Sequence, residues 1–268
     1  MEKEIRDILE TGRQNTDRSK ALKTILGILD LTTLEGADNT AKIGALCRKA
    51  VSFRDQGKDL PNVAAVCVYP TLVRTARGFL TNSDVKVASV AGAFPAGQSP
   101  LTIKVAEVRY AIEQGAEEID MVISRGKFLE GKKEEVASEI SAIKCACDSV
   151  HLKVILETGE LLTPENIKEA SGLAMGAGAD FIKTSTGKIS PGATLEAVYI
   201  MCQSIRDHYE KTGKMIGIKP AGGISDPDVV LDYFLLVKHL LGESWLNKNY
   251  FRIGASRLAD HILAELLT

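Results

Sequence analysis

The sequence predicts an α/β fold, a single TIM (β/α)8 barrel in which eight parallel strands form the inner ring and helices the outer one. Eight short apolar runs recur along the chain, each followed by a turn rich in Gly, Pro, Thr or Ser and then by a longer stretch of helical period. The ends of successive runs lie 23 to 37 residues apart, which suits a strand, a crossover helix and two loops. The 268 residues also match the roughly 250 that such a barrel needs.

The predicted strands take these apolar runs in order. They cover residues 27–32, 63–69, 85–90, 118–123, 152–157, 181–184, 215–219 and 251–254. Each run has the length of a strand and is bounded by turn residues.

The segments between the strands carry helix signals. Residues 102–114 place apolar side chains on one face of a helix. Thr163 and Asp226 each stand directly before a proline, which is the arrangement of a capping side chain followed by Pro at the first helical position. Residues 1–26 precede the first strand, and their apolar residues suggest short helices that cap the lower end of the barrel.

We therefore divide the chain into an N-terminal helical cap, residues 1–26, and a barrel domain, residues 27–268. No linker rich in Pro, Gly or Ser interrupts the alternation of strands and helices. The alternative fold is a doubly wound open sheet, which would require a glycine fingerprint after an early strand. The first strand ends instead in Asp30-Leu31-Thr32-Thr33.

Composition excludes several classes of function. The 33 basic and 35 acidic residues give a net charge of −2, which provides no electrostatic footprint for nucleic acid or for an anionic membrane. The chain does not begin with a signal-peptide pattern, and no apolar run reaches the roughly 18 residues of a membrane span. Five cysteines without a Cys-x-x-Cys pair argue against disulfides and a metal site, so we predict no metal and a cytoplasmic location. The sequence does not report oligomeric state, and a homodimer is compatible with it.

Two lysines stand at the ends of predicted buried strands. Lys183 closes the run Ala179-Asp180-Phe181-Ile182, and Lys219 closes the run Met215-Ile216-Gly217-Ile218. An ammonium group is costly to bury unless it is paired or loses its proton. A desolvated amine beside a second cation has a depressed pKa and attacks carbonyl compounds to form a Schiff base. The pair therefore predicts amine–carbonyl chemistry, although a single such lysine would more simply be read as reaching solvent.

Strand alternation places Lys183, Lys219 and Asp120 at the mouth of the barrel, from strands six, seven and four. Asp120 is the candidate for the proton transfers that carbon–carbon cleavage requires, or a carboxylate that simply neutralises Lys219. We interpret Lys153, near the start of its strand, as structural, and Glu157 as a residue that could hold a loop. Residue types alone do not decide which of the two mouth lysines is the nucleophile.

Several motifs resemble, in family order, those of the deoxyribose-phosphate aldolases. Besides the two lysine segments they are Leu29-Asp30-Leu31-Thr32-Thr33-Leu34, Ala65-Val66-Cys67-Val68-Tyr69-Pro70, Gly115-Ala116-Glu117-Glu118-Ile119-Asp120, Glu157-Thr158-Gly159-Glu160-Leu161 and Arg252-Ile253-Gly254-Ala255-Ser256. The resemblance implies a class I aldolase on a TIM barrel that reversibly cleaves 2-deoxy-D-ribose 5-phosphate to acetaldehyde and D-glyceraldehyde 3-phosphate. It implies no cofactor, because the protonated imine is itself the electron sink.

The resemblance also implies roles for residues. Lys183 is the Schiff-base nucleophile, Lys219 the cation that lowers its pKa, and Asp120 a proton relay acting with ordered water. We assign substrate binding to four residues, Asp30, Cys67, Thr186 and Lys188. By resemblance, Cys67 lines the aldehyde pocket and Asp30 matches an acidic family position, where it could take part in catalysis, pair with Lys219 or contact a substrate hydroxyl. By residue type alone, Cys67 is more simply a buried small hydrophobe.

Three turns after the late strands offer backbone amides to a phosphate group. Glycine lets the main chain approach an oxyanion, and a helix beginning just beyond adds a favourable dipole. We assign phosphate binding to Gly187, Gly222, Gly223, Gly254, Ser256 and Arg257. The sequence departs from the bacterial family pattern at two places. Arg257 follows Ser256 where the family has a second Ser, and Ile224-Ser225 follow the Gly-Gly turn where the family has an Arg after one intervening residue. We expect Arg257 to supply the positive charge that this second change removes.

Two other functions stay open at this point. One is a Schiff-base aldolase acting on a different phosphosugar or a keto acid, which borohydride trapping with acetaldehyde distinguishes. The other is a non-catalytic barrel that binds a phosphosugar, which predicts that Lys183→Met binds ligand normally and that the wild type turns nothing over.

Overall fold

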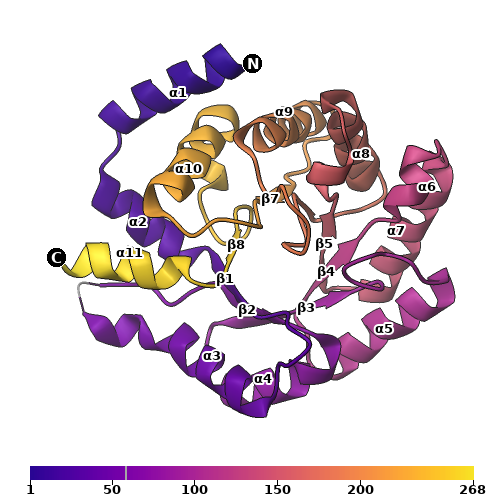
Figure 1. The fold of residues 1–268 in the computed structure, drawn as a ribbon, viewed down its shortest axis with the longest axis horizontal. Helices are drawn as coiled ribbons and strands as arrows, with labels where there is room; N and C mark the ends of the chain where they lie inside the picture. The colour runs from indigo at the N-terminus through magenta and orange to yellow at the C-terminus, as the bar shows by residue number, and fades with distance from the viewer. Residues whose placement is uncertain (58) are drawn as a thin grey trace.

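A ring of eight parallel strands forms the centre of the protein (Figure 1). The computed structural model describes residues 1–57 and 59–268. The strands are β1 (Leu29–Thr32), β2 (Ala65–Val68), β3 (Lys86–Ala91), β4 (Glu118–Val122), β5 (His151–Ile155), β6 (Phe181–Lys183), β7 (Gly217–Lys219) and β8 (Ile253–Ala255). They lie in the order β7-β6-β5-β4-β3-β2-β1-β8, and parallel bridges from Ile218 to Phe251 and from Ala221 to Gly254 close the ring. The predicted TIM barrel is confirmed.

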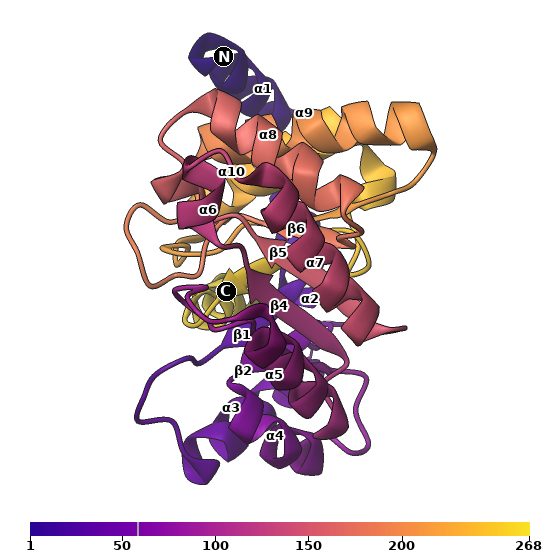
Figure 2. The same ribbon diagram turned by 90° about the vertical axis from the view of Figure 1, so that its right-hand side faces the viewer.

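One main helix follows each strand and packs outside the ring. These helices are α3 (Thr40–Ser52), α4 (Val73–Phe79), α5 (Leu101–Glu113), α7 (Lys133–Cys147), α8 (Pro164–Gly176), α9 (Leu195–Thr212), α10 (Pro227–Leu241) and α11 (Leu258–Leu267), with the short α6 (Arg125–Leu129) before α7. Four single 3-10 turns are η1 (Arg54–Gln56), η2 (Pro70–Leu72), η3 (Thr158–Glu160) and η4 (Glu243–Trp245). Seen from the side, the strands run between α8 to α10 and α3 to α5 (Figure 2).

The predicted helix starts are confirmed at atomic detail. The Thr163 side chain accepts a hydrogen bond from the Asn166 amide at 3.2 Å, directly before Pro164. Asp226 accepts from the Asp228 amide at 2.7 Å, before the proline that opens α10. Each cap satisfies a backbone donor that the first turn leaves free, which fixes where the helix begins after its loop.

Two N-terminal helices precede the barrel, α1 (Glu2–Gln14) and α2 (Arg18–Gly27). The first packs against α10 and α9, and the second against α10 and α11. Arg13 pairs with Asp232 at 2.7 Å, and Arg18 pairs with both Asp228 and Glu265. Short helices were predicted here, but α1 lies on the outer side of α10 rather than across the end of the barrel (Figure 1).

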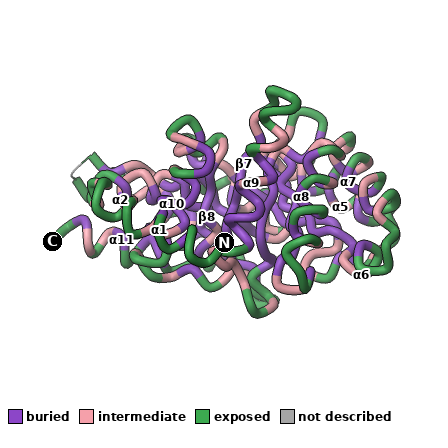
Figure 3. The backbone as a smooth tube through the Cα atoms, turned by 90° about the horizontal axis from the view of Figure 1, so that it is seen from above, coloured by how far each residue is buried: buried purple, intermediate pink, exposed green. Residues whose placement is uncertain are grey.

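Buried residues follow the strands and the inward sides of the helices (Figure 3). The apolar core therefore lies between the ring and the helices, as the continuous apolar runs of the strands require. The inside of the ring is different: seven charged side chains are buried there, and they determine what the barrel can do.

Candidate active site

The middle of β4 and the ends of β6 and β7 bring the predicted catalytic residues together. Lys183 and Lys219 are direct partners in the pairing of β6 with β7, so both side chains start at the same height along the barrel. The Nζ atoms of Lys183 and Lys219 lie 2.8 and 2.7 Å from the same oxygen, Oδ2 of Asp120. Asp120 and Lys219 are fully buried, and Lys183 is 3 % exposed. The predicted orientation of these three side chains is confirmed.

Asp30, the second residue of β1, completes this group. Its Oδ2 lies 2.5 Å from Nζ of Lys219, and the side chain is fully buried. Lys219 thus has two carboxylates, whereas Lys183 has only the oxygen of Asp120 that it shares with Lys219. The two amines are therefore unequal in their electrostatic support.

The pKa values of the two lysines move in opposite directions. Burial lowers the pKa of Lys183, attraction from Asp120 raises it in part, and repulsion from Lys219 lowers it again, so the net shift is downward. Burial also lowers the pKa of Lys219, but attraction from Asp120 and Asp30 outweighs it and the pKa lies above its usual value. Burial raises the pKa of Asp120, yet Lys153, Lys183 and Lys219 hold it well below its usual range. Lys183 is the amine most ready to act as a nucleophile.

Deeper in the ring lies a second set of charges that the sequence interpretation missed. Lys153 lies 2.6 Å from Glu118 and 2.9 Å from Asp120, in the middle of β5 rather than near its start. Arg252 donates to Glu118 through both terminal nitrogens and to Asp30 at 2.7 Å. Lys153 thus contacts the candidate catalytic carboxylate directly, which corrects its predicted place near the start of the strand.

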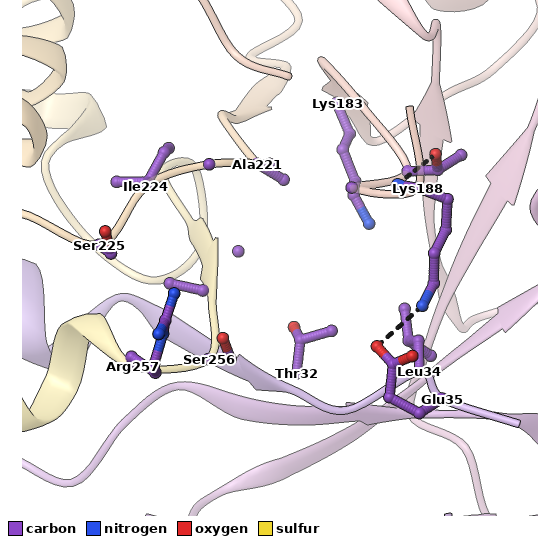
Figure 4. Close-up of a pocket in the computed structure, with 16 residues that line it drawn as sticks. Thr32, Leu34, Glu35, Lys183, Lys188, Ala221, Ile224, Ser225, Ser256 and Arg257 are labelled. Carbon is purple, nitrogen blue, oxygen red and sulfur yellow. Dashed lines mark hydrogen bonds and ion pairs between the residues drawn. The ribbon is translucent and has the colours of Figure 1, made fainter. Parts of the chain in front are cut away.

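A cavity of about 240 Å³ opens beside Lys183 (Figure 4). The turns after β6, β7 and β8 form its wall, and all six predicted phosphate residues line it: Gly187, Gly222, Gly223, Gly254, Ser256 and Arg257. Lys183 points into this space from β6, while Ser256 and Arg257 lie on the far side, at the start of α11. The cavity therefore joins a nucleophilic amine to a rim of glycine turns and a guanidinium, a combination suited to a small carbonyl compound with an anionic end.

Close backbone approach builds this rim. Gly222 has a φ of +92°, in the left-handed region that favours glycine. A Cβ at Gly192 would collide with the carbonyl oxygen of Gly222, so the loop after β6 and the turn after β7 touch main chain to main chain. The Thr184 hydroxyl joins the same two turns, donating to the Ala221 carbonyl at 3.0 Å and accepting from its amide at 2.9 Å.

Glu157 anchors the loop after β6 through hydrogen bonds to Thr186. Its carboxylate accepts from the Thr186 amide at 3.1 Å and from the Thr186 hydroxyl. The loop-holding interpretation of Glu157 is thereby confirmed. Thr186 in turn accepts from the Lys188 amide at 3.1 Å, and both Thr186 and Lys188 line the cavity.

Lys188 reaches across the cavity mouth to a residue that the sequence did not single out. Its Nζ lies 2.9 Å from Oε1 of Glu35, in the loop after β1 (Figure 4). That loop is fixed by Asp38, which accepts from the Glu35 amide at 2.9 Å and from the Thr33 hydroxyl. A lone glutamate in a loop gives no sequence signal, because only the folded loops place it opposite Lys188.

Cys67 lies apart from the cavity wall. It is fully buried with Leu34, Ala88 and Val90, and it is not among the described residues that line the cavity. Burial raises the pKa of its thiol to about 11. Its substrate-binding role therefore stays a prediction from resemblance.

Across residues 1–57 and 59–268, no group of three or more His, Cys, Asp and Glu side chains is placed to hold a metal ion. No helix within the same ranges is long and apolar enough to cross a membrane.

Comparison with known proteins agrees with this geometry. Residues 24–231 match the model of the DeoC/LacD family aldolases. The human deoxyribose-phosphate aldolase is 46 % identical over 251 residues, which is 89 % of this chain and 78 % of the human protein, and the mouse protein of that name is 44 % identical over the same coverage. The solved tetrameric deoxyribose phosphate aldolase of Aeropyrum pernix superimposes with a TM-score of 0.72 at 27 % identity, covering 98 % of each chain. Fold, paired lysines and family match converge, and the chain belongs to the DeoC/LacD family of aldolases.

Proposed function

We propose that the protein is a Schiff-base aldolase that reversibly cleaves 2-deoxy-D-ribose 5-phosphate to acetaldehyde and D-glyceraldehyde 3-phosphate. The observation that carries the proposal is the inequality of the two buried lysines. Lys183 has the depressed pKa and faces the cavity, while Lys219 is held as a cation by Asp30 and Asp120. The names of the relatives support the substrate.

The reaction begins with the attack of Lys183 Nζ on C1 of the open-chain sugar. Loss of water gives a protonated imine, and removal of the C3 hydroxyl proton breaks the C2–C3 bond and releases D-glyceraldehyde 3-phosphate. The electron pair of the broken bond passes into the imine and forms an enamine. Protonation of the enamine at C2 and hydrolysis of the imine release acetaldehyde and restore the amine.

Asp120 and Lys219 serve the proton steps of this proposal. Asp120 stays ionised and within hydrogen-bond distance of both amines, so it can orient Lys183 and, with ordered water, relay protons between the C3 hydroxyl and C2. Because the protonated imine accepts the electron pair, the reaction needs neither a metal nor an organic cofactor.

The 5-phosphate would occupy the far side of the cavity. Backbone amides of the glycine turns at Gly187, Gly222, Gly223 and Gly254 approach an oxyanion closely, and Ser256 and Arg257 stand at the start of α11. Asp30, Thr186 and Lys188 would contact the sugar or its phosphate, and Cys67 would pack behind the aldehyde end.

The decisive experiment combines turnover with location of the covalent adduct. Incubation with acetaldehyde and borohydride should leave an N-ethyl group on Lys183, located by mass spectrometry, and the enzyme should cleave 2-deoxy-D-ribose 5-phosphate. Lys183→Met should lose both activities, whereas Lys168→Met, on the exposed side of α8, should retain them. An enzyme that cleaves no deoxyribose phosphate, or an adduct on another lysine, would refute the proposal.

Two further properties are proposed, a location and an oligomeric state. We expect a cytoplasmic protein, since all five cysteines are free thiols. A homodimer is compatible with the sequence, and light scattering of the purified protein would test it.

A further inference from the structure

The inside of the barrel contains one connected network of buried charge. Its members are Asp30, Glu118, Asp120, Lys153, Lys183, Lys219 and Arg252, each 3 % exposed or less. Ion pairs of 2.5 to 2.9 Å link them from the lower part of the ring to the mouth. With each of these seven buried groups ionised, three carboxylates face four cations, so the network carries one positive charge in excess. Lys86 also pairs with Glu118 at 3.1 Å, but its side chain is 32 % exposed and its charge is therefore screened by solvent.

We propose that Glu118, Lys153 and Arg252 are positioning residues that set the protonation state of Lys183 through this charge balance. The inference rests on the proposed function, in which Lys183 is the nucleophile. A buried network favours neutrality because low-dielectric surroundings penalise uncompensated charge. Loss of one proton leaves three carboxylates against three cations, and the geometry decides which cation gives up that proton.

Lys183 is the cation with the least compensation. Lys153 has three carboxylates within 4.0 Å, those of Glu118, Asp120 and Asp30. Lys219 has two. Arg252 is held by two carboxylates and keeps its charge in proteins because guanidinium is a very weak acid.

Lys183, in contrast, has a single carboxylate oxygen and shares it. The groups that act on it are Asp120 from β4, Lys219 from β7 and the thiol of Cys67 from β2. Lys153 lies on the other oxygen of Asp120, so it competes for the same carboxylate. Removal of Lys153 therefore frees Asp120 to stabilise a charged Lys183.

The charge balance predicts shifts of opposite sign. Lys153→Met leaves three carboxylates against Arg252, Lys219 and a charged Lys183, so the pKa of Lys183 should rise and imine formation should require higher pH. Glu118→Gln leaves two carboxylates against Lys153, Lys219 and Arg252, so the pKa of Lys183 should fall further. Each midpoint should move by at least about one pH unit, as Coulomb interactions over one strand spacing at intermediate dielectric imply.

The double variant gives the sharpest test. Lys153→Met together with Glu118→Gln restores the excess of one cation, so its midpoint should return to that of the wild type. A role limited to folding would make the double variant at least as impaired as either single variant, without opposite pH shifts. Lys104→Met is a matched control, since it removes a buried lysine that pairs with Glu139 between α5 and α7, outside the ring.

The measurement is the initial rate of acetaldehyde imine formation on Lys183 against pH, by borohydride trapping and mass spectrometry, with folding checked by circular dichroism. This readout does not involve deoxyribose phosphate, so a wrong substrate in the proposed function would leave the test intact. Opposite shifts in the single variants and recovery in the double variant are expected. Shifts of the same sign, unchanged midpoints in folded single variants, or an equal shift in Lys104→Met would overturn the inference.

Discussion

A glycine in β7 makes room for the ring of Phe181, and replacing it tests how Lys183, the proposed nucleophile, is positioned. Gly217 and Phe181 are direct partners across β7 and β6, and Phe181 is 1 % exposed. A Cβ at position 217 would lie 2.6 Å from Cζ of Phe181 and nearer still to two other ring carbons. No real carbon pair approaches so closely, so Gly217→Ala requires the ring to move.

The ring has little space in which to move. It lies inside the barrel, with the guanidinium of Arg252 6.0 Å from its centre. Forcing an extra methyl group into a packed interior typically costs 1 to 3 kcal/mol. Because 1 kcal/mol corresponds to about 2 to 4 °C in Tm for a chain of this size, Gly217→Ala should lower Tm by about 2 to 12 °C.

The same substitution elsewhere in the chain provides the control. A Cβ at Gly172, on the exposed side of α8, would meet no atom within 4 Å. Gly172→Ala should therefore stabilise the protein, by about 0.5 to 1 kcal/mol, because alanine loses less backbone entropy in a helix.

The two variants are compared with the wild type by calorimetry, which gives Tm, and by the rate of imine trapping. Phe181 lies two residues before Lys183 on the same side of β6, so displacement of the ring should also slow imine formation in Gly217→Ala. Gly172→Ala should leave that rate unchanged. If Gly217→Ala were as stable as the wild type, the ring of Phe181 could move without cost. That result would refute the tight packing inferred between β6 and β7.

Two more predictions concern the cavity and the thiols. Glu35→Gln should tighten inorganic phosphate binding, measured by calorimetry, by about threefold to fivefold, because it releases Lys188 from a mostly exposed ion pair worth up to about 1 kcal/mol. Glu10→Gln on α1 is the charge control, and equal tightening there, or none at Glu35, would contradict the prediction. Cys67, whose thiol pKa is raised to about 11, should resist iodoacetamide at neutral pH, while the exposed Cys145 reacts. Peptide mapping locates the label, and faster labelling of Cys67 than of Cys145 would refute the prediction.

The positions of the strands followed from local sequence, but their ends did not. The run at 215–219 predicts a strand two residues longer than β7, which begins at Gly217. A strand exists only where a neighbour supplies its hydrogen bonds, and β6 begins at Phe181, the partner of Gly217. In the same way the run at 27–32 is shortened at its start because Gly27 is the last residue of α2.

Non-local pairing also explains why the inner charges were missed. A lysine early in an apolar run gives no local sign of a partner, which is why Lys153 was interpreted only as a structural residue near the start of its strand. In the fold, the register of β4 with β5 sets Lys153 opposite Asp120, and Glu118 lies two residues before Asp120 on the same face. Acidic and basic residues separated by more than thirty positions thus compensate each other, a relation that no local pattern contains.

The choice of nucleophile depends on the closure of the barrel itself. Lys183 and Lys219 end similar apolar runs, so their own strands cannot distinguish them. In the ring, β8 lies between β7 and β1, which brings Asp30 of β1 to Lys219, whereas β6 lies one strand further away. Asp120 approaches both lysines from β4 and so leaves them equal, but Asp30 reaches only Lys219 and holds its proton. The amine that loses its proton is therefore decided by which lysine stands nearer to the first strand.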